Sequence, residues 1–190
     1  MIVHLIGSRY QVDKNINHLR ILVDAIHDGA HTLAWDWVEP TFANVKRGGK
    51  NEIDWHAVYK ESMEAINKAD VIIADATIRG FGIGYQVAVA VQMKKPVLVL
   101  RHEEIDDSLF ASGIDTGVSY KSFKSAANLK NIIKEFLEEN DIKLKDMRFN
   151  FFIDRPIYNY LRWASFKTGK TKAEILRDLV SKEIEKQTLN

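Results

Sequence analysis

The chain has 190 residues, of which 46% are hydrophobic and 28% are charged, and its formal net charge is +1. These proportions are typical of an ordinary globular protein and exclude fibrous and highly charged disordered chains. The absence of cysteine excludes disulfides and thiolate metal sites, and the six histidines are scattered without a metal-ligand spacing. No apolar run approaches the roughly 20 residues of a membrane-spanning helix. We therefore expect a cytoplasmic protein without metal, cofactor or membrane partner.

Residues 1–139 alternate between expected strands and expected helices. Apolar, β-rich runs predict strands at 2–7, 31–37, 71–74, 96–100 and 118–123. Helical spacing of apolar residues predicts helices at 12–28, 54–68, 84–93 and 126–139, with a polar loop around 46–50. Continuous apolar strands between amphipathic helices are typical of a parallel sheet covered on both faces. The expected fold class is α/β, with a Rossmann- or flavodoxin-like sheet that binds its ligand beyond the carboxyl ends of the strands.

Residues 140–146 are polar and predict a linker to a second module at 147–190. Its first segment, 147–154, alternates like a strand, and Pro156 suits the first turn of a helix that Gly169 can end. Thr171 can cap a second helix. One strand and two short helices bury too little surface to fold alone, so we expect the strand to pair with a second copy. The chain is then a homodimer or a higher even-numbered homo-oligomer.

The charge of this C-terminal module differs from that of the rest of the chain. Residues 147–190 carry nine Lys or Arg and five Asp or Glu, whereas the remainder carries 18 and 21. A basic module favours an anionic partner such as DNA, although ordinary surface variation also accounts for a difference of this size.

The stretch "RFNFFIDRPIYNYLRWASFKTGKTKAEILRDLVSKEIEK" resembles the ribbon–helix–helix family of dimeric DNA binders. The resemblance implies that a two-chain ribbon enters the major groove of double-stranded DNA with Arg148, Asn150 and Phe152 facing the bases. It also implies that Thr171 and Lys172 contact phosphate at a helix N-terminus. Phe152 departs from the family pattern, which has a polar residue there. Operator binding and dimerisation alone both remain open.

The stretch "ADVIIADATIRGFGIGYQVAVAVQMKKPVLVL" (69–100) resembles the nucleoside 2-deoxyribosyltransferase family, and within it the nucleoside 5′-monophosphate N-glycosidases. The resemblance covers about residues 1–137 and includes the opening Gly-Ser turn at Gly7 and Ser8. It implies a pocket for a nucleoside or nucleotide. A Gly-x-Gly turn alone would be weak evidence, so the order and spacing of the whole stretch carry the resemblance.

The family's catalytic glutamate and aspartate correspond to Gln86 and Ser62 in this chain. Cleavage of an N-glycosidic bond builds positive charge on the sugar C1′, which an ionised carboxylate stabilises or attacks. Glutamine has nearly the same shape as glutamate but no charge and little nucleophilicity. The resemblance therefore implies a binding scaffold that has lost its catalytic carboxylates.

The candidate nucleotide-binding residues lie in two turns of the expected sheet. The family's phosphate-loop serine corresponds to Gly80, and glycine lets the backbone approach an anion closely. Tyr10, Trp35 and Trp37 can stack a base, although both tryptophans also fit a core position, and Asp36, Glu39, Glu61 and Asp75 are the spare carboxylates. The full candidate set is Gly7, Ser8, Arg9, Tyr10, Arg79, Gly80, Gly82 and Gly84.

Three functional hypotheses follow from these residues. The first is a dimeric, DNA-binding regulator that binds a nucleotide or nucleoside in a degenerate glycosidase site. The second is an active N-glycosidase or deoxyribosyltransferase, in which Gln86 is an engineered inactivating change or another carboxylate serves. The third is a purely structural or partner-binding protein that binds neither nucleotide nor DNA. A nucleotide panel separates the third hypothesis from the others, because a ligand specific for the folded state stabilises that state.

Overall fold

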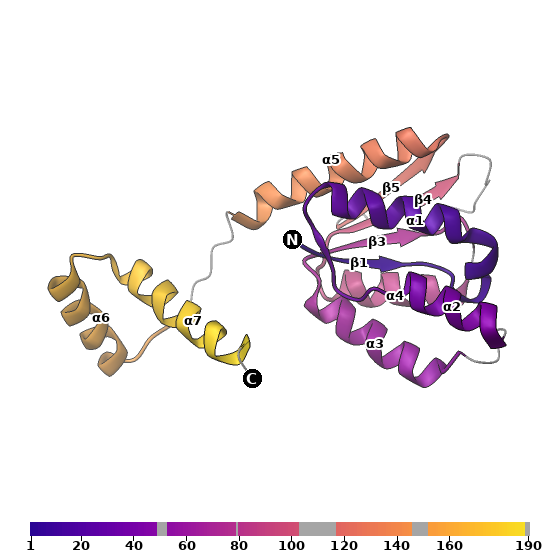
Figure 1. Cartoon of the computed structure of the whole chain (residues 1–190). Coiled ribbons are helices and arrows are strands. Elements are labelled where there is room, and N and C mark those ends of the chain that lie inside the picture. The colour runs from indigo at the N-terminus through magenta and orange to yellow at the C-terminus, as the bar shows by residue number, and fades with distance from the viewer. Residues whose placement is uncertain (49–52, 79, 103–116, 146–151, 189–190) are drawn as a thin grey trace. The chain divides into compact units, whose positions relative to one another are not determined.

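The computed structural model describes residues 1–48, 53–78, 80–102, 117–145 and 152–188. The chain divides into two compact units, Met1–Asp146 and Met147–Asn190. The elements of the N-terminal unit are shown in Figure 1 and run in the order β1 (Ile2–Ile6), η1 (Arg9–Gln11), α1 (Val12–Asp28), β2 (Thr32–Leu33), α2 (Val38–Gly48), α3 (Trp55–Lys68), β3 (Val71–Asp75), α4 (Phe81–Gln92), β4 (Val97–His102), β5 (Val118–Phe123) and α5 (Ala126–Lys145).

The five strands form one parallel sheet in the order β2-β1-β3-β4-β5. This arrangement confirms the predicted α/β class and is the strand order of flavodoxin-like sheets. After β1 the chain continues to β2, at one edge of the sheet, and after β3 it continues to β4, toward the opposite edge. The loops after β1 and β3 therefore separate at the carboxyl edge, and a crevice between them is the expected ligand site.

Apolar residues bury both faces of this sheet. On one face Val3, Leu5 and Ile73 pack with α1 and α5, and on the other Ile6, Ile72 and Val99 pack with α3 and α4. Figure 1 shows the two helical layers on either side of the strands. Because β1, β3 and β4 are buried on both faces, their sequences are almost continuously apolar, as the parallel-sheet interpretation required.

The second strand and the loop after it differ from the prediction. Only Thr32–Leu33 pair with β1, and residues 38–48 form helix α2 in place of the predicted loop. The Trp37 indole N–H donates to the Leu5 carbonyl at 2.8 Å, and this buried contact turns the chain away from the sheet edge. Val38, Phe42 and Val45 then recur at helical spacing against the core, a pattern that the neighbouring glycines and lysines obscured.

Two helix boundaries also differ. Helix α4 begins at Phe81, three residues before the predicted start, so Gly82 lies inside its first turn. Helix α5 continues through Lys145, so the predicted linker at 140–146 is helical up to that residue. Asn140 is buried and its side-chain amide donates to the Phe136 carbonyl at 2.8 Å, which keeps this polar residue compatible with a helix.

The C-terminal unit contains helices α6 (Arg155–Thr168) and α7 (Lys172–Thr188). The predicted caps are confirmed: Gly169 has a φ of 71°, and the Thr171 hydroxyl accepts from the Glu174 N–H at 3.2 Å while Glu174 accepts from the Thr171 N–H. Most of the predicted strand at 147–154 lies outside the described residues. None of the helices within the described ranges is long and apolar enough to span a bilayer.

Candidate functional site

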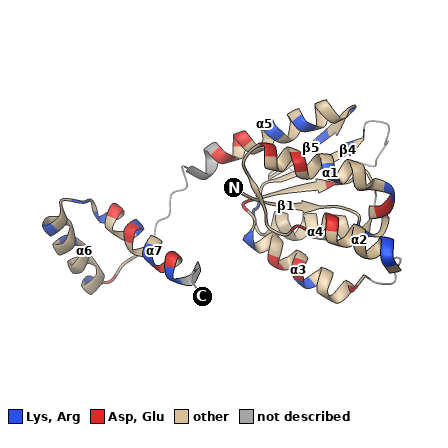
Figure 2. Cartoon of the chain, viewed as in Figure 1, with Lys and Arg blue, Asp and Glu red and all other residues tan. Residues whose placement is uncertain are grey.

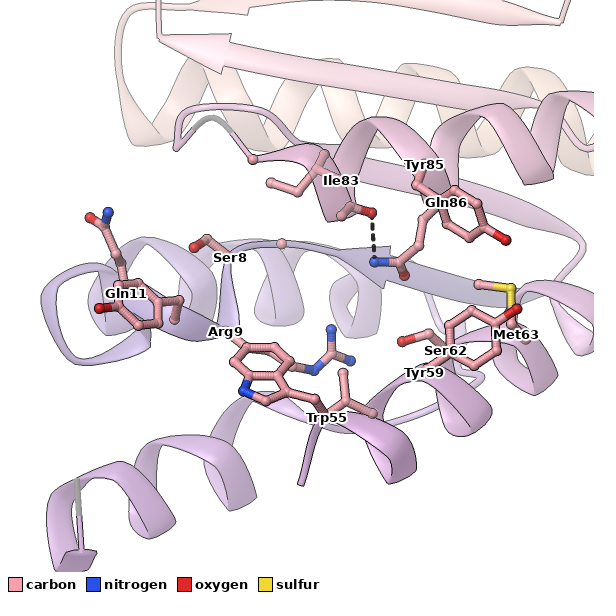
Figure 3. A pocket seen from close by; sticks show the side chains of 15 residues that line it. Ser8, Arg9, Gln11, Trp55, Tyr59, Ser62, Met63, Ile83, Tyr85 and Gln86 are labelled. Atoms are coloured by element: carbon pink, nitrogen blue, oxygen red, sulfur yellow. Dashed lines mark hydrogen bonds between the residues drawn. The ribbon is translucent and has the colours of Figure 1, made fainter. Parts of the chain in front are cut away.

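A pocket of about 410 Å³ opens where the loops after β1 and β3 separate (Figure 3). Helices α3 and α4 form its two long walls, and the β1–α1 turn forms its end. The residues that line it come from the turn after β1, from the face of α3 that points to the pocket, and from the first turns of α4. They are Gly7, Ser8, Arg9, Tyr10, Gln11, Trp55, Val58, Tyr59, Ser62, Met63, Gly80, Gly82, Ile83, Tyr85 and Gln86.

Arg9 is the main charged group of this pocket. Its side chain is only 4% exposed, and its guanidinium lies 4.4 Å and 4.2 Å from the ring centres of Trp35 and Trp37. Burial lowers the pKa of Arg9 to about 9, and no carboxylate in the described part of the chain offsets that cost. The Nε and Nη2 atoms of Arg9 have no hydrogen-bond partner there either. A buried cation with unused donors is suited to an anionic ligand.

His4, in the middle of β1, is a second buried basic group under the pocket. It is fully buried, and neither ring nitrogen has a hydrogen-bond partner among the described residues. Burial and the nearby Arg9 guanidinium lower the pKa of His4 to about 4, and the Gln86 amide only partly opposes this shift. His4 is therefore a neutral imidazole near pH 7, with one ring nitrogen that donates and one that accepts.

The two positions of the family carboxylates lie close to these groups. Figure 3 shows Ser62 on α3 and Gln86 on α4 facing the same space as the Arg9 guanidinium. The Gln86 amide donates to the Gly82 carbonyl at 3.1 Å, while Gln86 Oε1 and Ser62 Oγ are buried without a partner. Neither side chain carries a charge, so the described floor of the pocket has a positive group and no negative one.

The glycines at the start of α4 leave open space over the helix N-terminus. A Cβ added at Gly80, Gly82 or Gly84 would meet nothing within 4 Å, so packing does not require glycine there. Gly80, the N-cap residue, offers no side chain to the first N–H groups of the helix. The Ile83 N–H donates to the Gly80 carbonyl at 3.1 Å, so the N–H groups of Phe81 and Gly82 are the ones that the start of the helix offers to an anion. Gly7 differs, because a Cβ there would lie 3.2 Å from Leu19 and Trp37, so its absence of a side chain also serves packing.

Aromatic side chains surround the pocket mouth. Trp55 and Tyr59 extend from α3 and Tyr85 from α4, and the rings of Tyr59 and Tyr85 lie 6.4 Å apart. Exposed Tyr10 lines the end of the pocket, and its role in stacking a base stays a prediction. Trp35 and Trp37 are not among the residues that line the pocket; they pack with the core, the alternative that the sequence left open, and against the Arg9 guanidinium.

The remaining predicted residues lie elsewhere. Arg79, Arg148 and Asn150 fall outside the described residues, and Phe152 is exposed. Asp75 is buried on the α1 side of the sheet, where it accepts from the Thr77 N–H at 3.1 Å and the Asn15 amide at 3.3 Å and faces His18. Thr171 and Lys172 lie at the start of α7, with the Lys172 ammonium 4.4 Å from the Tyr158 ring centre.

Sequence reasoning missed His4, Trp55, Tyr59 and Tyr85. A histidine inside an apolar strand was one available signal, because a buried polar group needs a partner. The spacing of Trp55, Tyr59 and Ser62 was another, because residues three and four apart share a helix face. The aromatic residues of α3 were otherwise indistinguishable from a core stripe.

Two curated archaeal proteins resemble this chain in sequence. Each is named for 2′-deoxynucleoside 5′-phosphate N-hydrolase activity; the one from Methanosarcina mazei is 27% identical over 120 residues, covering 62% of this chain and 72% of the relative. The one from Methanosarcina barkeri is 28% identical over the same length, covering 62% and 73%. No protein-family model matches the chain.

Solved structures share the fold of the N-terminal unit. The CMP N-glycosidase of Clostridium botulinum superposes with a TM-score of 0.52 at 13% identity, covering 70% of this chain and 98% of that one. The 2-deoxyribosyltransferase of Bacillus psychrosaccharolyticus superposes with a TM-score of 0.50 at 17% identity, covering 69% and 91%. The N-terminal unit is nucleoside 2-deoxyribosyltransferase-like. Its sheet and helices follow the deoxyribosyltransferase fold, and its sequence is similar to those of the two proteins named as N-hydrolases.

Proposed function

We propose that the N-terminal unit binds a nucleoside 5′-monophosphate without cleaving its glycosidic bond. The observation that carries this proposal is the buried Arg9, which has no carboxylate partner among the described residues and lies beside uncharged Gln86 and Ser62. The ligand phosphate supplies the missing negative charge, and the aromatic rim of Trp55, Tyr59 and Tyr85 holds the base.

The charges of the pocket floor favour binding over catalysis. The transition state of glycosidic cleavage carries positive charge on the sugar, and a catalytic site places negative charge beside it. In this pocket the buried charge is the Arg9 guanidinium, with the polar His4 ring beneath it. Such a floor repels the developing oxocarbenium ion and attracts a phosphate.

The proposal extends to the C-terminal unit, which we infer to be a ribbon–helix–helix dimer that binds double-stranded DNA. Only Leu161, Ala164 and Ile175 are buried together in the described part of this unit, while Leu179, Val180 and Ile184 of α7 are exposed. A second copy that covers the exposed face of α7 completes the core.

Helix α6 carries Lys and Arg but no acidic residue, whereas α7 carries both signs (Figure 2). The whole chain is then a dimeric regulator that responds to a nucleotide.

An active N-glycosidase is the second candidate, and the names of the two sequence relatives favour it. This candidate requires either a glutamate at position 86 in the natural protein or a carboxylate from outside the described residues. Asp75 is unsuited to the task, because its oxygens are occupied by Asn15, Thr77 and His18 on the opposite side of the sheet.

One experiment separates the two candidates. The chain and its Gln86→Glu and Ser62→Asp/Gln86→Glu variants are incubated with a panel of nucleosides and 5′-monophosphates, and free base is measured by chromatography. We expect no base from the chain with Gln86, together with a higher unfolding temperature in the presence of at least one 5′-monophosphate. Release of base by the chain with Gln86 overturns the binding proposal. If only the variants release base, the pocket is a glycosidase site that Gln86, alone or together with Ser62, makes inactive.

DNA binding is tested separately by fluorescence anisotropy with random double-stranded DNA over a range of salt concentrations. Counterion release makes the affinity fall steeply with salt if the unit contacts phosphates. Lys172→Ala is expected to lower the salt slope by about one contact. Lys130→Ala in α5, whose side chain pairs with Asp28, is the matched control. If the anisotropy does not change, or if the affinity does not depend on salt, the C-terminal unit does not bind DNA through its phosphates and only its proposed role in dimerisation remains.

A further inference from the structure

The outer face of helix α6 exposes aromatic rings that the described core of the C-terminal unit does not use. Leu161 and Ala164 of this helix are buried against α7. Away from that contact, Tyr160, Trp163 and Phe166 are 49%, 55% and 93% exposed, and the rings of Tyr160 and Trp163 lie 6.0 Å apart. Ordinary surfaces expose such residues singly, whereas large rings gathered on one face mark an interaction site.

The charged residues of α6 are all basic (Figure 2). Arg155, Arg162 and Lys167 are exposed, and none of them pairs with a carboxylate among the described residues. The Lys167 ammonium lies 4.9 Å from the centre of the Trp163 ring. Asp154, which precedes the helix, is occupied as its N-cap and accepts from a backbone N–H of the first turn at 3.0 Å. We call the following set the α6 face: Arg155, Tyr160, Arg162, Trp163, Phe166 and Lys167.

The composition of the α6 face favours one kind of partner. Its three cations have no acidic neighbour within the helix and require an anion, and a second copy of the same face would oppose them with like charges. The face has rings but no leucine, isoleucine or valine, whereas a helix that inserts into lipid relies on a broad apolar side. A nucleotide chain supplies both matching groups, because its phosphates pair with the cations and its bases stack on the rings.

We propose that the α6 face binds single-stranded nucleic acid, whose bases stack on Tyr160, Trp163 and Phe166. Three residues advance an α-helix by about 4.5 Å, so rings at this spacing can receive successive bases of one strand. In a duplex the faces of the bases are already stacked on one another, so the α6 face selects single strands. The contact is distinct from the duplex contact proposed above, which uses the ribbon together with Thr171 and Lys172, and it holds whether or not that proposal is correct.

Fluorescence anisotropy of the full chain with labelled oligothymidylate and oligouridylate tests the proposal, and the two probes distinguish DNA from RNA. We expect at least one of them to bind and to resist competition by unlabelled duplex DNA. Trp163→Leu keeps an apolar side chain but removes the ring, whereas Trp163→Phe keeps a ring. We expect Trp163→Leu to lower the single-strand affinity roughly 5- to 100-fold, as the loss of one stacked base requires, and Trp163→Phe to lower it less.

Phe166→Ala and Phe81→Ala form a matched pair, because each removes a phenyl ring that is at least 90% exposed on a helix. We expect Phe166→Ala to weaken single-strand binding about as much as Trp163→Leu, and Phe81→Ala, in α4, to leave it unchanged. Equal affinities of the unaltered chain, Trp163→Leu and Phe166→Ala overturn the proposal. Failure of both oligonucleotides to bind also overturns it, and binding of anionic lipid vesicles in that case makes the α6 face a membrane contact.

Discussion

The carboxyl edge of the sheet has two buried polar centres, one on each face, and they differ in how their polar atoms are used. On the α1 face, Asp75 accepts from Thr77 and Asn15 and faces His18. On the α3–α4 face, Arg9, His4, Ser62 and Gln86 retain buried polar atoms without partners among the described residues. Buried polar groups that serve only the fold are normally paired. On the α1 face the His18 Nε2 and Thr77 Oγ1 atoms also lack a hydrogen-bond partner, but the charged group there, Asp75, is paired, whereas the charged Arg9 is not. This difference between the two charged groups assigns a structural role to the Asp75 centre and a binding role to the Arg9 centre.

The largest expected effect comes from breaking the paired centre. Asp75→Ala leaves the Asn15 amide, the Thr77 N–H and the His18 ring without their buried acceptor. We expect the free energy of unfolding to fall by roughly 3–5 kcal/mol. Chemical denaturation measures the loss, and Asp36→Ala at an exposed carboxylate is the control. A loss below 1 kcal/mol would show that the Asp75 centre is not structural.

The unpaired centre predicts a pH dependence. Because the pKa of His4 in the folded chain is lowered to about 4, His4 is protonated below pH 6.5 in the unfolded chain but stays neutral in the folded chain until the pH approaches 4. The stability from His4 is therefore complete above pH 6.5 and is lost as the pH falls toward 4, by about 3 kcal/mol. We expect His4→Phe to remove this part of the slope in denaturation curves at pH 4 to 7. The same slope in both proteins would contradict the assignment of a neutral His4.

Arg9 allows binding and stability to be separated. Arg9→Met removes a buried, unpaired charge while keeping an extended side chain between Trp35 and Trp37. We expect the affinity for a 5′-monophosphate to fall by roughly 10- to 100-fold, because hydrogen bonds to charged groups are worth about 1.5–3 kcal/mol. The stability of the free protein is expected to stay equal or to rise. A destabilised variant with unchanged affinity would make Arg9 a structural residue.

The smallest expected effect is at Gly82. Alanine fits there without a clash and suits a helix better than glycine, so Gly82→Ala is expected to stabilise the chain by about 0.5–1 kcal/mol. Its Cβ projects into the space over the helix N-terminus, so we expect weaker nucleotide binding from calorimetry. Gly169→Ala is a contrasting change, because a φ of 71° makes alanine unfavourable there. Tighter nucleotide binding by Gly82→Ala would contradict the placement of the phosphate at the start of α4.

Periodicity predicted most of the fold, since the boundaries of α1 and β5 and the end of α3 at Lys68 agree with the structure. It failed where tertiary contacts decide the outcome. The bond from Trp37 to Leu5 ends the second strand early, and buried Asn140 lets α5 continue through a polar segment. The glycines of α4 favoured a loop, but the apolar contacts of Ile83 and Val87 extend the helix over them.

The candidate site divides in the same way. Arg9, Ser62, Gly82 and Gln86 line one pocket, and their functional roles there stay predictions. The sequence left Trp35 and Trp37 open between base stacking and the core, and the structure packs them in the core against Arg9. Cation–π contacts between segments that far apart leave no pattern in a single sequence. The role of His4 depends likewise on burial, which its position in an apolar strand only suggests.

The most direct test of the account is a calorimetric titration of the full chain with a nucleoside 5′-monophosphate and with the matching nucleoside, followed by chromatography of the same samples for free base. We predict saturable binding of the monophosphate and no free base. The nucleoside is expected to bind at least about tenfold more weakly, because it lacks one or more charge-assisted hydrogen bonds to Arg9. Equal binding of the two ligands, or the appearance of free base, would contradict the claim that Arg9 holds a phosphate in a pocket without a catalytic carboxylate.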